Sequence, residues 1–522
     1  MTPEQLRRNV VRSTVSSYIR ILLRLALGLA TFRLLFQSLR PEEFGFWSLL
    51  WALFGAGVLL DFGLGAAAQK RVAELTVRQE WDELSRILST ILGFHVFSSL
   101  IVVALGIVAS GPIIDLLQVS PGNRERFRVV FQVFLIGTGI AFPLGIFPEI
   151  LQGQQRITTA NNVAIASLVA NFVAVAAFIA LELSFLTLVV LALLCVIVPY
   201  IAAAWIAIRH MPRVRLRPSL LSLSALASTG RFSLYAYLNM LGSVLRTKAD
   251  PPILGGILGI AAVTPYQAGA KVGEMFGMLT RQIADVLSPT AAHLHARGDT
   301  PALREMLLQG LRFSVLAATP LYVLSAAYTD GLIRLLTGVE HPTPEMIWTG
   351  ELLLFWYYSL TLTHWVYKRM FLMAGQERRM MWQGVSEAAL NLVLSIVLTL
   401  ALRNILGVAI GSVIPTVVLG WGVLWGWAAH EAGLGRWALF RKIVLPVWLG
   451  SIPMVALAAV LRLQPWWTSG GTTLLVLAEG AAVGTAGLAG LWWITLQPAE
   501  RANLASRLRG GNNPQPAATT GA

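Results

Sequence analysis

Apolar stretches of about 20 residues recur along this chain, and short polar segments, most of them basic, separate them. A helix of that length crosses a hydrocarbon core about 30 Å thick, whereas barrel strands would be about 10 residues long and would alternate in polarity. The pattern therefore predicts an all-α polytopic membrane protein. About 14 transmembrane helices are expected, near residues 14–36, 46–66, 86–108, 128–150, 161–181, 185–208, 231–252, 262–287, 306–328, 346–368, 381–402, 405–428, 443–462 and 473–496.

Composition and charge support this class and orient the chain. Of the 522 residues, 56% are hydrophobic and 13% are charged, against about 25% charged in a soluble protein. The basic segments 69–86, 209–219 and 368–379 fall on one side of the predicted helices, which the positive-inside rule makes cytoplasmic. Both termini are then cytoplasmic, the first helix is an uncleaved span, and residues 118 and 335 lie outside. The net charge of +14 follows from topology and contact with anionic membrane lipids, so no nucleic-acid partner is expected.

The chain also contains an internal repeat. The segment LRPEEFGFWSLLWAL (39–53) opens the second predicted span, and LGIAAVTPYQAGAKV (258–272) opens the eighth. An offset of roughly 220 residues holds six spans, which gives both halves the same orientation and makes a parallel repeat. The sequence thus predicts an N-terminal six-helix lobe (1–210), a C-terminal six-helix lobe (211–430), two additional transmembrane helices (431–500) and a disordered cytoplasmic tail (501–522).

Three segments resemble a known family: FGFWSLLWALFGAGVLLDFGLGAAAQKRVAE (44–74), FPEILQGQQRITTANN (147–162) and ADPPILGGILGIAAVTPYQAGAKVGEM (249–275). They are similar to the O-antigen-flippase-like, polysaccharide-flippase branch of the multidrug/oligosaccharidyl-lipid/polysaccharide exporter superfamily, over most of residues 10–430. The resemblance implies a flippase of the bacterial cytoplasmic (inner) membrane that moves a polyprenyl-pyrophosphate-linked oligosaccharide outward for cell-surface polysaccharide biosynthesis. Polysaccharide polymerase or assembly proteins are its implied partners.

Arginines inside the first predicted span are candidates for binding the diphosphate of that substrate. Arg20 and Arg24 are four residues apart, hence on one helix face, and Arg24 is close to mid-membrane. A charge there is expected to face a bundle interior or a water-filled cavity. Arg33 is near the outer end of the span and is expected to snorkel to the interface.

The second lobe adds three candidate cations, Arg246, Lys248 and Lys271. Arginine forks match phosphate oxygens, and lysine supplies a point charge. A structural alternative stays open for two of them, because Arg246 is four residues from Asp250 and Lys271 is three residues from Glu274.

Carboxylates inside the predicted spans are candidates for ion or proton coupling: Asp61, Glu149 and Glu387. Asp61 could instead cap a helix or pair with a basic residue, and Glu149, beside the helix-breaking Pro143 and Pro148, could pair at the interface. Glu387 is equally ambiguous.

Trp356, Tyr357 and Tyr358 form an aromatic group that could stack on sugars. The alternative is an aromatic belt at the membrane interface or core packing.

Enzyme functions lack their motifs in this sequence. It contains no GxxxxGK[ST] loop, no HExxH and no Ser-centred elbow, so we expect no catalytic residues, no metal and no cofactor. A membrane glycosyltransferase or polysaccharide ligase would need a large outer loop, and the outer connections are short. The main alternative is a cation-coupled multidrug exporter of the same superfamily, which would need acidic residues in its cavity.

Overall fold

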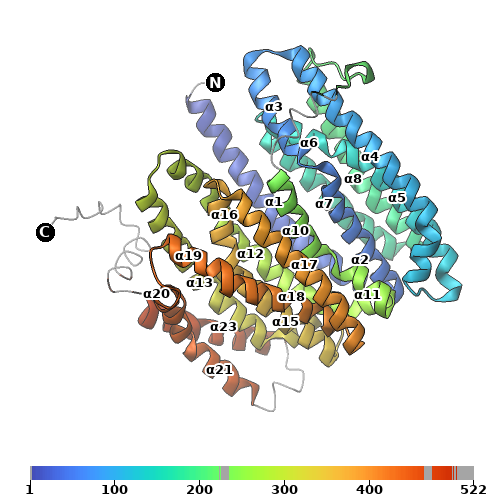
Figure 1. Ribbon diagram of the computed structural model, residues 1–522. Helices are drawn as coiled ribbons and strands as arrows, with labels where there is room; N and C mark the ends of the chain where they lie inside the picture. Colours follow the sequence, from blue (N-terminus) through green and yellow to red (C-terminus); the bar gives the residue numbers. More distant parts are fainter. Residues whose placement is uncertain are drawn as a thin grey trace. The chain divides into compact units, whose positions relative to one another are not determined.

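The computed structural model describes residues 3–222, 234–463 and 473–496, together with residues 224, 498 and 501 (Figure 1). Every regular element in these ranges is helical, and none of the described residues is in a strand. The predicted tail beyond residue 501 lies outside the described residues. The all-α prediction is confirmed.

Contacts divide the chain into two compact units. Unit 1 comprises Met1–Met275, Leu332–Leu353 and Gln376–Leu419, and unit 2 comprises Phe276–Gly331, Leu354–Gly375 and Gly420–Ala522. The lobe boundaries expected from the internal repeat stay a prediction.

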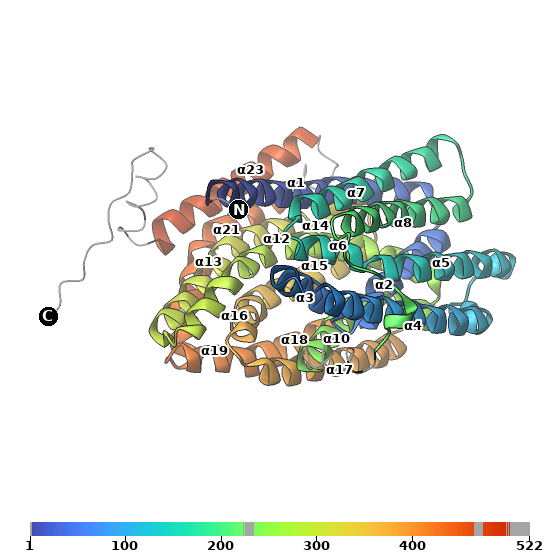
Figure 2. The same ribbon diagram turned by 90° about the horizontal axis from the view of Figure 1, so that it is seen from above.

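Unit 1 begins with the helices of the N-terminal half of the chain. These are α1 (Pro3–Ser38), α2 (Pro41–Ala56), η1 (Gly57–Asp61), α3 (Leu64–Arg78), α4 (Trp81–Leu116), η2 (Pro121–Asn123), α5 (Arg124–Leu144), α6 (Ile146–Gly153), α7 (Ile157–Ala180), α8 (Phe185–Arg209) and η3 (Pro218–Leu220). Helix α4 lies beside α5, α5 and α7 both lie against α8, and α1 lies against α7 (Figure 2). The break between α5 and α6 at Gly145 falls between Pro143 and Pro148, where the sequence predicts a kink.

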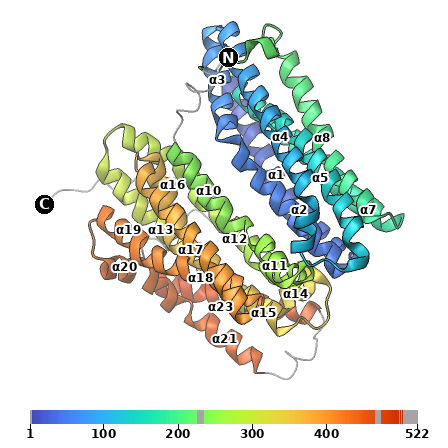
Figure 3. The same ribbon diagram turned by 45° about the vertical axis from the view of Figure 1, so that its right-hand side comes forward.

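The later helices of unit 1 are α10 (Leu234–Lys248), α11 (Asp250–Leu258), η4 (Ile260–Ala262), the first part of α12 (Val263–Ala296), the end of α14 (Thr329–Thr337), the first part of α15 (Pro344–Leu360), α17 (Glu377–Leu402) and α18 (Leu406–Leu419). Helix α17 packs along both α10 and α18 (Figure 3).

Unit 2 holds the rest of α12, α14 and α15 together with the C-terminal helices. Its further elements are α13 (Thr300–Ala327), η5 (Thr361–Trp365), α16 (Val366–Met373), η6 (Gly420–Leu424), α19 (Trp425–Glu431), α20 (Arg436–Gly450), α21 (Ile452–Arg462), α23 (Thr473–Gly490) and η7 (Leu491–Thr495). The elements η5, η6 and η7 are π-helical turns.

Many of these helices are long enough to cross a membrane. Within the described residues, nine helical segments have the length and apolar composition of a span. A lipid bilayer leaves apolar side chains on a helix surface without penalty, and large exposed side chains such as Leu105, Val108, Val198 and Trp205 lie on these segments. The protein is therefore a multi-pass helical membrane protein, and the expected total of about 14 spans stays a prediction.

One end of unit 1 joins helices that are distant in sequence. The Ile260 N–H donates to the Leu117 carbonyl at 3.0 Å, and the Thr264 hydroxyl donates to the Pro41 carbonyl at 2.7 Å. Gly45 faces the Ile260 carbonyl so closely that a Cβ there would overlap the oxygen. The ends of α2 and α4 are thereby joined to η4 and α12 at the end that the sequence places outside the cytoplasm.

Candidate functional site

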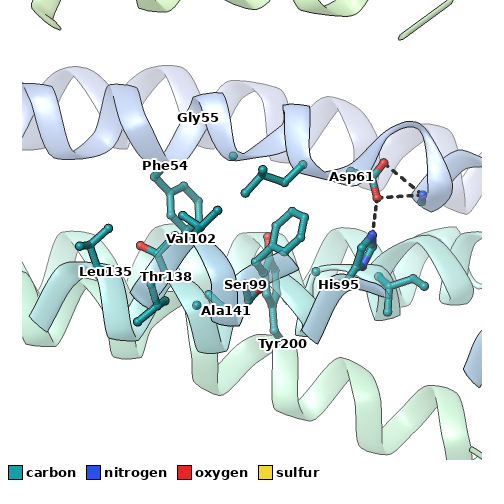
Figure 4. A pocket seen from close by; sticks show the side chains of 18 of the residues that line it. Phe54, Gly55, Asp61, His95, Ser99, Val102, Leu135, Thr138, Ala141 and Tyr200 are labelled. Atoms are coloured by element: carbon teal, nitrogen blue, oxygen red, sulfur yellow. Dashed lines mark hydrogen bonds and ion pairs between the residues drawn. The ribbon is translucent and has the colours of Figure 1, made fainter. Parts of the chain in front are cut away.

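Unit 1 contains a cavity of about 450 Å³ between α2, η1, α3, α4, α5, α6 and α8. Most of its wall is apolar, and Figure 4 shows Phe54, Val102, Leu135 and Ala141 along its length. Its polar wall consists of Asp61, His95, Ser99, Thr138, Glu149 and Tyr200. Two of the three acidic residues predicted for coupling, Asp61 and Glu149, therefore lie in one cavity.

Asp61 is held at one end of this cavity by a tight turn. Phe62 and Gly63 both adopt left-handed backbone angles, with φ of 49° and 78°, and this turn brings the Asp61 carboxylate over the start of α3. The Gly65 N–H donates to both carboxylate oxygens, at 2.9 and 3.1 Å. The capping alternative left open by the sequence thus describes the local geometry of Asp61.

His95, on α4, is the second partner of Asp61. Its Nε2 lies 3.0 Å from Oδ1 of Asp61 (Figure 4), and its side chain is 2% exposed. Nδ1 of His95 is buried and has no hydrogen-bond partner among the residues that the structure describes. The sequence analysis missed this residue, although an imidazole within a long apolar stretch is itself a signal of a polar interior site.

Glu149, on α6, connects the cavity with the arginines of α1. It interacts electrostatically with Asp61 and with Arg20, and its side chain is hydrogen-bonded to Gln152. Tyr200 of α8 lies within electrostatic range of both Glu149 and Arg24. Residues predicted for two separate roles are therefore within electrostatic range of each other, although Arg20 and Arg24 are not among the residues that line the cavity.

Arg20 and Arg24 make no ion pair in the described part of the chain. Arg20 is partly exposed and Arg24 is exposed, and the two repel each other electrostatically. Arg33 lies further along α1, where its guanidinium donates to the Leu335 carbonyl. These three arginines thus differ in what surrounds them: within the described residues, Arg33 has a direct polar partner, whereas none is found for Arg20 or Arg24.

Arg246 lies in a closed polar network. Its Nη1 is 2.7 Å from Glu387, whose side chain is 0% exposed, and Glu387 also accepts hydrogen bonds from Gln383 at 2.8 Å and Thr416 at 2.7 Å. Asp250 instead accepts a hydrogen bond from Tyr266. The pairing of Arg246 with Asp250 assumed one continuous helix, but α10 ends at Lys248 and α11 begins at Asp250.

The two candidate lysines, Lys248 and Lys271, also differ in whether they have a carboxylate partner. Lys271 is 2.8 Å from Glu274, so the neutralising alternative describes its geometry. Lys248 makes no ion pair among the described residues. Its side chain lies over Gly55, because a Cβ added to Gly55 would be 3.3 Å from Cε of Lys248. Because Gly55 lines the cavity, Lys248 is close to the cavity wall.

The three candidate stacking residues are packed inside unit 2. The hydroxyl of Tyr358 shares a hydrogen bond with Thr319 at 2.8 Å and accepts one from Trp448 Nε1 at 2.7 Å. Trp356 is buried and its ring lies 4.7 Å from that of Tyr357. These contacts fit the packing alternative for this group. No group of three metal-ligating side chains occurs within the residues described.

Comparisons with known proteins agree with this architecture. A family model described as "Polysaccharide biosynthesis protein" matches residues 34–342. None of the curated proteins matches the sequence.

Solved structures share the fold at low sequence identity. An inward closed conformation of the lipid II flippase MurJ is 14% identical, covers 92% of this chain and 99% of its own, and has a TM-score of 0.69. An inward-facing multidrug resistance MATE family transporter of the MOP superfamily is 15% identical, with coverages of 81% and 99% and a TM-score of 0.64. A MOP superfamily transporter from Pyrococcus furiosus is 17% identical, with coverages of 81% and 95% and a TM-score of 0.59.

Proposed function

The chain belongs to the polysaccharide biosynthesis protein family, and from this membership we propose that it is a flippase for a polyprenyl-pyrophosphate-linked oligosaccharide. It would move this lipid from the cytoplasmic to the outer leaflet of a bacterial inner membrane, with both termini in the cytoplasm. The two six-helix lobes predicted by the repeat would provide alternating access. Polysaccharide polymerase or assembly proteins would receive the product.

The observation that carries this proposal is the pair of arginines on α1. A guanidinium at membrane depth costs roughly 2.5–3.5 kcal/mol on insertion scales, and Arg20 and Arg24 have no carboxylate within 4.0 Å in the described residues to offset this cost. A diphosphate would supply the missing charge, with oxygens that match the guanidinium fork. Lys248 would add a third cation, whereas Arg246 and Lys271, also candidates from the sequence, have carboxylate partners of their own.

Asp61 and Glu149 are proposed to couple transport to an ion or proton. Glu149 interacts electrostatically with both Asp61 and Arg20. A change in the charge of Glu149 would therefore alter the electric field at the proposed diphosphate site. Glu387 has a different position, because its carboxylate accepts three hydrogen bonds inside the α10–α17–α18 bundle. Coupling is therefore assigned to the cavity rather than to that bundle.

Charge reversal at Arg24 tests the proposal. We expect Arg24→Glu to reach the membrane in normal amounts and to abolish complementation of a polysaccharide-export mutant, because the added carboxylate repels the diphosphate. The host with this variant should accumulate the lipid-linked oligosaccharide on the cytoplasmic leaflet. Arg33→Glu is the matched control on the same helix and should retain export. Full complementation by Arg24→Glu would contradict the diphosphate role.

A multidrug exporter of the same superfamily is a second candidate, and one observation favours it. The residues that line the cavity include Asp61 and Glu149 and neither lysine nor arginine, as a site for cationic drugs requires. Loss of the protein should then raise sensitivity to cationic dyes and leave lipid-linked sugars unchanged. We expect the opposite pattern, because Arg20, Arg24 and Lys248 beside the cavity offset its carboxylates.

A further inference from the structure

A segment after α8 carries three exposed arginines. In residues 211–217, Met211, Val214 and Leu216 pack into the core formed with α3, α4, α6 and α8, while Arg213, Arg215 and Arg217 are exposed. Arg213 lies in a turn that the Val214 N–H closes by donating to the Met211 carbonyl at 3.0 Å, and the chain after this turn is extended, so Arg215 and Arg217 share one outward face. We call these three residues the arginine strip.

Hydroxyl groups on α4 fix the backbone of this strip. The Arg215 N–H donates to Ser85 Oγ at 3.0 Å, the Arg217 N–H donates to Ser89 Oγ at 3.1 Å, and the Ser222 N–H donates to Thr90 Oγ1 at 3.2 Å. Ser85 and Ser89 are about 6 Å apart along the helix axis, which matches the roughly 6.6 Å between alternate residues of an extended chain. The strip is therefore a preformed row of cations.

The guanidinium groups of the strip have no acidic partner in the described part of the chain. No carboxylate of the described residues lies within 4.0 Å of them, whereas Lys70 and Arg71 on neighbouring α3 are both paired with Glu74, at 3.8 and 3.5 Å. Lys70 and Arg71 thus share one carboxylate, Glu74, whereas the arginines of the strip are available to an external anion.

Two tryptophans lie beside arginines at or next to the strip, as is typical of a segment at the depth of lipid headgroups. The Arg213 guanidinium lies 6.0 Å from the centre of the Trp81 ring, and the guanidinium of Arg209, at the end of α8, lies 5.2 Å from that of Trp205. Tryptophan is enriched at the interface between membrane and water, and the sequence places this segment on the cytoplasmic side. The phosphates of anionic lipids occupy the same level.

We propose that Arg213, Arg215 and Arg217 form a binding site for the phosphate groups of anionic phospholipids at the membrane surface. Each guanidinium presents paired N–H donors to phosphate oxygens, and the fixed backbone lets neighbouring arginines bind without first being ordered. This site is separate from the proposed diphosphate site at Arg20 and Arg24, and it would hold whether or not the substrate is a lipid-linked sugar.

Lipid binding by the full-length protein in detergent tests this proposal directly. The probe is phosphatidylglycerol, with phosphatidylcholine and inorganic phosphate as comparison ligands. We expect the triple variant R213Q/R215Q/R217Q to bind phosphatidylglycerol about tenfold to a hundredfold more weakly and to bind phosphatidylcholine as before. Binding to the unmodified protein should weaken as ionic strength rises.

The double variant K70Q/R71Q is the matched control, since it removes nearby positive charge that is already paired. Unchanged phosphatidylglycerol affinity in the triple variant would overturn the proposed site. An equal loss of affinity in the control would show that net charge, and not the arginine strip, determines binding. Equal affinity for inorganic phosphate would assign the strip to free anions instead of lipids. If the triple variant does not fold, R215Q alone should weaken binding about fivefold, and an unchanged affinity would again overturn the site.

Discussion

Two regions of unit 1 hold arginines of predicted spans in opposite ways. In the α10–α17–α18 bundle, Arg246 is 11% exposed and pairs with a fully buried Glu387, which two further side chains also contact. On α1, Arg20 and Arg24 are more exposed and have no ion-pair partner in the described residues. The difference teaches that an arginine in an apolar helix does not by itself indicate a ligand. Our proposal of a ligand for Arg20 and Arg24 rests on the lack of a carboxylate partner in the described residues together with family membership.

The largest effect is expected from breaking the closed network. Glu387→Ala leaves Arg246 buried without its counterion, and removal of one member of a buried pair costs about 3–5 kcal/mol. Thermal unfolding of the purified protein in detergent should show a clear loss of stability. If Glu387→Ala is as stable as the unmodified protein, the network does not hold this bundle together.

A smaller effect is expected at Asp61, which caps α3. Asp61→Leu removes the acceptor of the Gly65 N–H, and the loss of a helix cap costs about 0.5–2 kcal/mol. Asp61→Asn keeps one acceptor oxygen, so its stability should be closer to that of the unmodified protein. Equal destabilisation by Leu and Asn in the same unfolding measurement would show that the negative charge, and not the cap, is what matters for folding.

Removal of a partly exposed pair should matter less still. Lys271→Gln breaks the contact with Glu274, whose side chain is 51% exposed, and such pairs contribute about 0–1 kcal/mol. A loss comparable with that of Glu387→Ala would show that this pair too belongs to a desolvated network.

The smallest change in stability is expected at Arg24. Arg24→Gln removes no internal contact, so the free energy of unfolding should change by less than about 0.5 kcal/mol, while export of the lipid-linked oligosaccharide should fall sharply. Strong destabilisation would show that Arg24, like Arg246, stabilises the fold, and the two regions would then not differ in this respect.

Much of the architecture could be predicted from the sequence, because length, polarity and proline positions are local signals. The apolar stretches predict the helices, and Pro143 and Pro148 predict the break between α5 and α6. The sequence also allowed Asp61 to cap a helix. In the structure, η1 ends at Asp61 and α3 begins three residues later.

The partners across the fold could not be predicted in this way. Arg246 and Glu387 are 141 residues apart, and spacing along one helix gives no information about such a pair. His95 meets Asp61 only because α4 passes the turn after η1. The arginine strip depends on the match between hydroxyl spacing on α4 and the rise of an extended chain, which appears only when both segments are in place.

The join between α2, α4 and η4 has a consequence for kinetics. In the proposed flippase function, release of a sugar on that side would require the Ile260–Leu117 and Thr264–Pro41 hydrogen bonds to separate and the close contact at Gly45 to open. These contacts use the backbone of Ile260, Leu117 and Pro41, the Thr264 hydroxyl and the missing Cβ of Gly45. Because they lie close together on neighbouring segments, we expect them to separate together. We therefore expect the lifetime of this join to set an upper limit on how many molecules the protein can deliver each second.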